Sequence, residues 1–96
     1  MKNVYLVTYD ISNPKRLRRI FKLMKRFGDH VQFSVFVCRL SERRKKNLEL
    51  LISDIIEPEE DQVLVFSIGS EKNFKVEDVV TLGIPFLYEY RKPIIV

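Results

Sequence analysis

The chain has 96 residues, enough for one small domain that folds without a metal ion or a disulfide to hold it together. Its composition is 46% hydrophobic and 31% charged, with a net charge of +4 and one cysteine, which excludes a disordered chain and a disulfide scaffold. The sequence shows neither an apolar run of about 20 residues nor a signal peptide, so we expect a soluble, cytoplasmic protein with no membrane partner.

The first predicted elements are a strand and a helix. A β-rich run over residues 4–9 ends on Asp10. The pair Asn13-Pro14 then supplies a good N-cap and a proline at the first helical position. Apolar residues recur at helical spacing over 17–27, and Gly28 marks the end of this helix.

The next run, residues 30–40, is β-rich but too long for one typical strand. Dividing it at a tight bend near Phe33-Ser34 gives two strands. Ser41 then caps a second helix that Pro58 interrupts, and residues 63–68 form another strand. The resulting order, βαββαβ, is the ferredoxin-like arrangement, a two-layer α+β sandwich.

The whole chain is expected to form a single domain, with residues 1–68 as its core and 69–96 as a C-terminal loop and extra strand. Within the tail, residues 76–82 and 86–90 carry the remaining β-type patterns. A two-layer sandwich leaves one sheet face to solvent, yet the strand segments 4–7 and 63–66 are apolar on both faces. We therefore predict a homodimer in which the two sheets pack together and the tails are exchanged.

Asp10 is the principal candidate for chemistry. Asp at a strand end usually forms a turn or caps the next helix, but Asn13 already fills the cap position. A carboxylate at the end of a strand is also a suitable oxygen ligand for Mg²⁺ or Mn²⁺. One carboxylate makes a poor site, whereas a twofold axis would supply Asp10 twice, beside the phosphates of a substrate.

Basic residues are concentrated in the first half of the chain, where residues 1–50 hold 13 Lys and Arg against four Asp and Glu. Several lie at helix N-termini, where cations are unfavourable unless an anion such as phosphate is bound there. An unevenly charged but merely solvated surface is the alternative explanation. The candidate contacts to a nucleic-acid backbone, without sequence specificity, are Lys15, Arg16, Arg18, Arg19, Lys22, Arg43 and Arg44.

Other polar residues carry weaker signals. Tyr9 and Ser34 could hydrogen-bond or orient a phosphate near Asp10, and they complete the candidate catalytic set. His30 is interpreted as an exposed residue at a strand start, and Cys38 as a small buried hydrophobe. The acidic run over residues 57–61 is interpreted as a solvated helix end.

Several short motifs together resemble the CRISPR-associated protein 2 family. They are YDIS at 9–12, KRLRRI at 15–20, FG at 27–28 and VQFSVFVCRL at 31–40, followed by SE. The resemblance covers about the first 68 residues. It implies a ferredoxin-like homodimer with a metal aspartate at Asp10, a motif tyrosine at Tyr9 and a motif serine at Ser34, while Leu17 stands where some relatives have arginine.

Three functions follow from this resemblance and from the residues. The first is a Mg²⁺-dependent endonuclease, or phosphodiesterase, acting on RNA or duplex DNA. The second is a non-catalytic dimeric subunit that bridges DNA for the CRISPR integrase during spacer acquisition in antiviral defence. The third is a toxin-like RNA-cleaving module of similar fold. The sequence does not decide between RNA and DNA.

Overall fold

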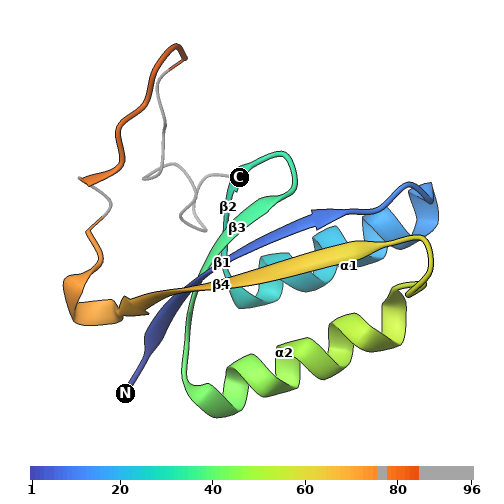
Figure 1. Ribbon diagram of the computed structural model, residues 1–96, viewed down its shortest axis with the longest axis horizontal. Coiled ribbons are helices and arrows are strands. Elements are labelled where there is room, and N and C mark those ends of the chain that lie inside the picture. The colour runs from blue at the N-terminus through green and yellow to red at the C-terminus, as the bar shows by residue number, and fades with distance from the viewer. Residues whose placement is uncertain (76–77, 85–96) are drawn as a thin grey trace.

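The computed structural model describes residues 1–75 and 78–84, which form one sheet with two helices packed on the same face (Figure 1). The sheet order is β2-β3-β1-β4, with every neighbouring pair antiparallel. This is the predicted ferredoxin-like α+β sandwich. The elements are β1 (Asn3–Asp10), α1 (Pro14–Phe27), β2 (Asp29–Gln32), β3 (Val35–Leu40), α2 (Glu42–Ile55), β4 (Gln62–Ser70) and a short 3₁₀ helix (Glu71–Asn73).

Both helices begin at the caps that the sequence predicts. The side-chain oxygen of Asn13 accepts hydrogen bonds from the backbone N–H groups of Lys15 and Arg16, each at 3.0 Å. Ser41 accepts one from the backbone N–H of Arg44 at 3.2 Å. These bonds satisfy donors that have no partner inside a helix, so the helix starts are determined locally.

The link between α1 and β2 depends on Gly28, which passes very close to β3. A Cβ atom at this position would lie 2.4 Å from the sulfur of Cys38 and 2.6 Å from the carbonyl oxygen of Val37. Glycine is required here by space rather than by backbone conformation. Cys38 is fully buried, and burial raises the pKa of its thiol to about 12, which confirms its interpretation as a small buried hydrophobe.

The predicted division of residues 30–40 is confirmed. β2 ends at Gln32 and β3 begins at Val35, with the turn at Phe33-Ser34 between them. Phe33 takes a positive φ of 27°, which is rare for a bulky side chain. The turn therefore holds an aromatic residue where glycine or asparagine would be the ordinary choice.

The helices cover one face of the sheet, and the other, the open face, is exposed along β4 but buried at Val37, which pairs with Leu6. Tyr5, Val7 and Tyr9 of β1 belong to the core cluster that faces the helices. Residues of the opposite parity point the other way, and in β4 they include Leu64 and Phe66, which is 48% exposed. The prediction of apolar residues on both faces is confirmed, whereas the second copy that would cover the open face stays a prediction.

The predicted β-type segment at 76–82 is wrong for its described part, because residues 79–82 form no strand. The predicted strand at 86–90 lies outside the described residues, and so does the predicted exchange of tails. No helix in the described ranges is long and apolar enough to span a bilayer.

Candidate active site

Asp10 is the last residue of β1, where it pairs across the sheet with Gln62 of β4. Strand alternation places its side chain with those of Leu6 and Thr8, on the face away from the helices. The residue is exposed, and no hydrogen bond or ion pair involves its carboxylate within residues 1–75 and 78–84. The Asp10 carboxylate is therefore free to act as a metal ligand or hydrogen-bond acceptor for a partner or substrate on the open face.

Tyr9 and Ser34, which the sequence grouped with Asp10, lie on the other side of the sheet. Tyr9 is buried in the core, with its ring centroid 6.3 Å from that of Phe36. Burial raises the pKa of its phenol, and the Ser34 hydroxyl acts in the opposite direction. The backbone N–H of Tyr9 donates to the carbonyl of Ser34 at 3.1 Å, so these two residues are adjacent. The structure does not bring them together with Asp10, because neighbouring strand residues point to opposite faces, and the catalytic roles of Tyr9 and Ser34 stay predictions.

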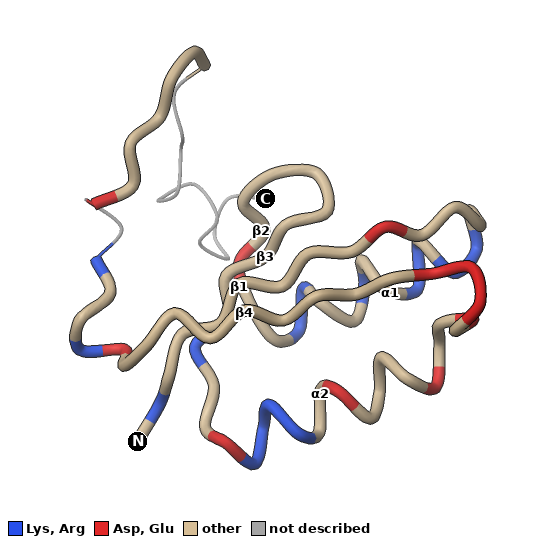
Figure 2. The backbone as a smooth tube through the Cα atoms, viewed as in Figure 1, with Lys and Arg blue, Asp and Glu red and all other residues tan. Residues whose placement is uncertain are grey.

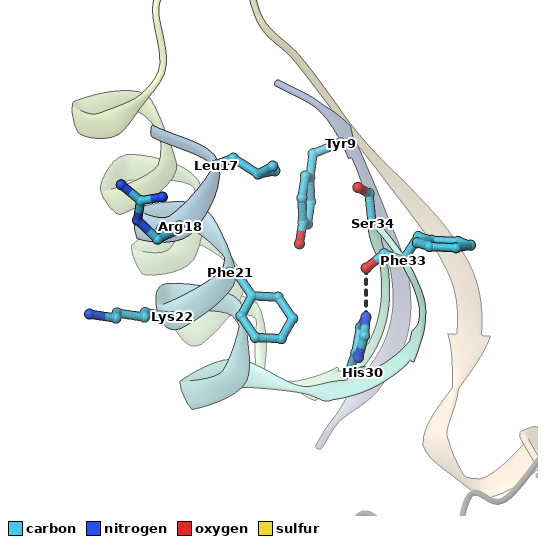
Figure 3. Close-up of a pocket in the computed structure, with 8 residues that line it drawn as sticks. All are labelled: Tyr9, Leu17, Arg18, Phe21, Lys22, His30, Phe33 and Ser34. Atoms are coloured by element: carbon cyan, nitrogen blue, oxygen red, sulfur yellow. Dashed lines mark hydrogen bonds between the residues drawn. The ribbon is translucent and has the colours of Figure 1, made fainter. Parts of the chain in front are cut away.

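Tyr9 and Ser34 instead line a groove of about 500 Å³ between α1 and the turn that joins β2 to β3 (Figure 3). Sequence reasoning missed this groove, because Phe21 and His30 read individually as core and turn residues. The one signal present in the sequence was Phe33, an aromatic residue at a predicted bend. The lining residues are Tyr9, Leu17, Arg18, Phe21, Lys22, His30, Phe33 and Ser34.

Most of the α1 cations that were predicted to contact a nucleic-acid backbone are exposed. Figure 2 shows Lys and Arg along α1 and in the first turns of α2. The first turn of α1 contains no acidic residue, so its N-terminal partial charge adds to that of the cations. The exposed members of this set are Lys15, Arg18, Arg19 and Lys22.

Arg16 is the exception, because it is ion-paired within the fold, and its contact with a nucleic acid stays a prediction. Its Nε lies 2.6 Å from Oδ2 of Asp61, and its Nη2 lies 3.1 Å from Oε1 of Glu60. The Asp61 side chain is fully buried and also accepts the backbone N–H of Glu57 at 2.8 Å. These bonds hold the pKa of Asp61 below its ordinary value, with Arg16 as the main cause. Arg16 therefore anchors α1 to the acidic loop rather than facing solvent.

The interpretation of residues 57–61 as a solvated helix end is confirmed for Glu57, Glu59 and Glu60, which are exposed, and is wrong for Asp61, which is buried. Figure 2 shows this acidic loop beside the start of α1. Part of the charge asymmetry along the chain is thus neutralised inside the fold. The placement of a cation in the first turn of α1 is explained for Arg16, whereas Arg18 and Arg19 keep their exposed positions.

The two predicted contact cations at the start of α2, Arg43 and Arg44, are both exposed. The guanidinium of Arg44 lies over the Phe27 ring, 4.4 Å from its centroid, which joins the start of α2 to the end of α1. His30, interpreted as exposed, is half-buried: its ring packs against Phe21 and Phe36 at centroid distances of 5.1 and 4.9 Å.

A metal site cannot be completed by the described part of this chain. Within it, no group of three or more His, Cys, Asp or Glu side chains gathers to hold an ion. Mg²⁺ is commonly held by only one or two carboxylates together with substrate phosphates. The exposed Asp10 carboxylate fits such a shared site, provided that a second carboxylate and a phosphate come from outside the chain.

Comparison with known proteins shows which family the chain belongs to. A family model described as CRISPR associated protein Cas2 matches residues 3–76. The chain belongs to the Cas2 family. It is similar over its full length, at 41% identity, to a protein of Geobacter sulfurreducens named CRISPR-associated endoribonuclease Cas2, whose full length is also covered. A Halalkalibacterium halodurans protein named CRISPR-associated endonuclease Cas2 is 32% identical over 77% of this chain and 82% of its own.

Solved structures of a Cas2 protein and of a hypothetical protein show the same fold. The crystal structure of Streptococcus pyogenes Cas2 superposes with a TM-score of 0.73 at 34% identity, covering 83% of this chain and 99% of that one. The structure of a hypothetical protein from Thermus thermophilus gives a TM-score of 0.75 at 28% identity, covering 88% and 94%. The Cas2 resemblance predicted from the motifs at 9–40 is confirmed.

Proposed function

We propose that this Cas2-family protein is a metal-dependent endonuclease that cleaves the phosphodiester backbone of single-stranded RNA. The observation that carries the proposal is the exposed Asp10 carboxylate at the end of β1, without a partner among the described residues, on an apolar sheet face. The names of the relatives, an endoribonuclease and an endonuclease, support this reaction class.

The open face argues for a second copy as the source of the other carboxylate. Leu64, Phe66 and Ile68 of β4 are all between 42% and 48% exposed, and Leu6 lies beside Phe66 in the sheet. A surface of this kind is typically covered by a partner. Because Asp10 shares this face, a symmetric dimer formed through it would contribute Asp10 from both copies.

Mg²⁺ or Mn²⁺ bound there would supply positive charge to stabilise the reacting phosphate and would lower the pKa of a water molecule. The role of Asp10 is to bind the ion through its carboxylate. The role of Arg19 and Lys15, both exposed on α1, is to hold the flanking phosphates by charge.

A second candidate function is favoured by the spread of the exposed cations. They extend along α1 and into the start of α2, farther than one cleavage site requires. Such a surface suits a dimer that holds duplex DNA by its backbone for the CRISPR integrase, without reading bases. In this case cleavage would be secondary to DNA bridging.

A cleavage assay with the wild-type protein distinguishes the two functions. We expect labelled single-stranded RNA to be cut internally in Mg²⁺ or Mn²⁺ and to stay intact in EDTA, with activity restored when metal is added back. Tight binding of duplex DNA with no cleavage of either nucleic acid, in any metal, would contradict the nuclease and support the bridging subunit.

The exposed arginines of α1 give a separate prediction for binding. Arg18→Ala and Arg19→Ala should each weaken binding to all sequences alike. Each should lower the slope of log affinity against log salt by about 0.9 on duplex DNA, or ~0.7 on single strands. Thermal stability should be unchanged or slightly higher, because a cation leaves a helix N-terminus. The matched control is Lys72→Ala in the distant 3₁₀ helix. An unchanged slope with lower stability would show that these arginines serve the fold.

A further inference from the structure

Asp10 is held in the sheet from one side only. The pairing of β1 with β3 ends where Thr8 meets Val35, so among the described residues the ladder partner of Asp10 is Gln62 alone. Gln62 is the first residue of β4, which lies at the edge of this sheet. Strand ends of this kind open locally at little cost in free energy. The position of Asp10 therefore depends on what holds the start of β4.

The residue before Gln62 supplies that anchor. The Asp61 side chain is fully buried, and its carboxylate accepts hydrogen bonds from Arg16 through both oxygens, at 2.6 Å from Nε and 3.2 Å from Nη2. Oδ2 also accepts the backbone N–H of Glu57 at 2.8 Å. Two bonds from a planar guanidinium fix the direction of the carboxylate as well as its distance. The start of β4 is thereby joined to the start of α1.

The start of α1 is also close to Asp10 along the chain, because only residues 11–13 separate the two. Ile11 is buried in the core and Asn13 caps the helix, so this link is fixed at both ends. Figure 1 shows the end of β1, the start of α1 and the start of β4 at the same end of the sheet. The ion pair between α1 and β4 thus closes a ring of contacts that includes Asp10.

Stability alone does not explain why a buried ion pair closes this ring. Removing a carboxylate from water costs free energy that its attraction to a cation often only balances, so apolar residues of similar size would stabilise the fold as well. Two directed bonds add a single geometry for the segments that they join. A metal ligand needs such geometry, since loss of the contacts that orient a ligand typically weakens metal binding or activity by about 10–100-fold.

We propose that Arg16 and Asp61 are positioning residues for the metal site, and that their ion pair sets where the Asp10 carboxylate lies on the open face. In this role neither residue touches the metal ion or the substrate. Both act through the backbone, Arg16 by way of α1 and Asp61 by way of Gln62. The proposal rests on the proposed function, because it takes Asp10 as the metal ligand.

Asp61→Asn tests the proposal without removing a cation from α1. The amide keeps the shape of the carboxylate but has one oxygen, so it cannot accept both bonds from the guanidinium. At a temperature where every variant is folded, we expect the Mn²⁺ concentration for half-maximal cleavage of labelled RNA to rise about tenfold. RNA affinity in EDTA should not fall. Arg16→Lys keeps the charge but not the two directed bonds, and it should raise the Mn²⁺ requirement in the same way.

A second readout follows the backbone of the metal-free protein. Hydrogen exchange of the amides at the Asp10 end of the β1–β4 ladder should be faster in Asp61→Asn than in the wild type. Exchange at the other end of the ladder, near Asn3, should be unchanged. This measurement reports the position of the strands and does not depend on cleavage.

Two control variants separate positioning from stability. Glu60→Gln changes the exposed second partner of Arg16 and leaves the bonds to Asp61 in place, so both readouts should be unchanged. Leu48→Ala opens a cavity under α2 and should lower the Tm at least as much as Asp61→Asn, but it should leave the Mn²⁺ requirement unchanged.

The possible failures are distinguishable. Metal-dependent cleavage by the wild type, with an unchanged Mn²⁺ requirement in Asp61→Asn, would overturn the positioning role and leave the proposed function intact. An equal rise in Leu48→Ala would also overturn it, because loss of stability alone would then account for the effect. A wild-type protein that cleaves no RNA in any metal would overturn both this proposal and the proposed function.

Discussion

Asp10→Ala is expected to reduce metal-dependent cleavage to background while leaving most of the nucleic-acid affinity. The carboxylate is the proposed metal ligand, whereas phosphate contacts by exposed cations supply most of the binding free energy. Asp10 is exposed and makes no ion pair among the described residues, so its removal breaks no stabilising contact. Thermal stability should therefore be unchanged, or slightly higher if two carboxylates face each other in a dimer without metal.

Two further variants and one measurement control this experiment. Asp10→Asn keeps the shape but not the charge and should also be inactive, whereas Asp54→Ala, which removes an exposed carboxylate from α2, should retain cleavage. Light scattering should give twice the 11.5 kDa chain mass for the wild type and for all three variants. Undiminished cleavage by Asp10→Ala would refute the assignment, and a monomeric wild-type protein would leave the metal site incomplete.

Arg16→Ala is expected to lower the Tm by several degrees, the largest stability effect of any single cation in α1. The Asp61 carboxylate is fully buried and would lose the guanidinium that compensates its charge. Arg19→Ala, three residues along the same helix, is the matched control and should be neutral, because Arg19 is exposed. Circular dichroism melts of the two variants provide the measurement. Equal Tm values would show that the pair contributes nothing to stability.

The same ion pair should have a pH signature. Arg16 and the backbone N–H of Glu57 lower the pKa of Asp61 in the folded state from its ordinary value of 3.8. A lowered folded pKa adds stability that is fully present above the unfolded pKa and is lost as the pH falls toward the folded one. The stability difference between wild type and Asp61→Asn should therefore be largest near neutral pH and shrink below about pH 4. A difference that does not change with pH would contradict this account.

Much of the fold could be predicted from the sequence because its signals are local. The Asn13 and Ser41 caps, the apolar spacing of α1 and the excessive length of residues 30–40 each act within a few residues. Together they fixed the βαββαβ order and the turn at Phe33. The tail was harder, because the pattern at 76–82 suggested β structure that the described residues do not form.

Part of the candidate site could be predicted from neighbouring residues, and part depends on contacts between residues that lie far apart in the chain. The sequence by itself determined that Asp10 ends a strand and does not cap the following helix. Strand alternation could also have shown that the side chains of Asp10 and Tyr9 point to opposite faces of the sheet. Only the tertiary structure could show that Arg16 meets Asp61, which lies 45 residues away, and that Phe21, His30 and Phe33 form one groove. The physical reason is that a helix face or a strand parity is set by neighbours in sequence, whereas the partner of a side chain is set by how the elements pack.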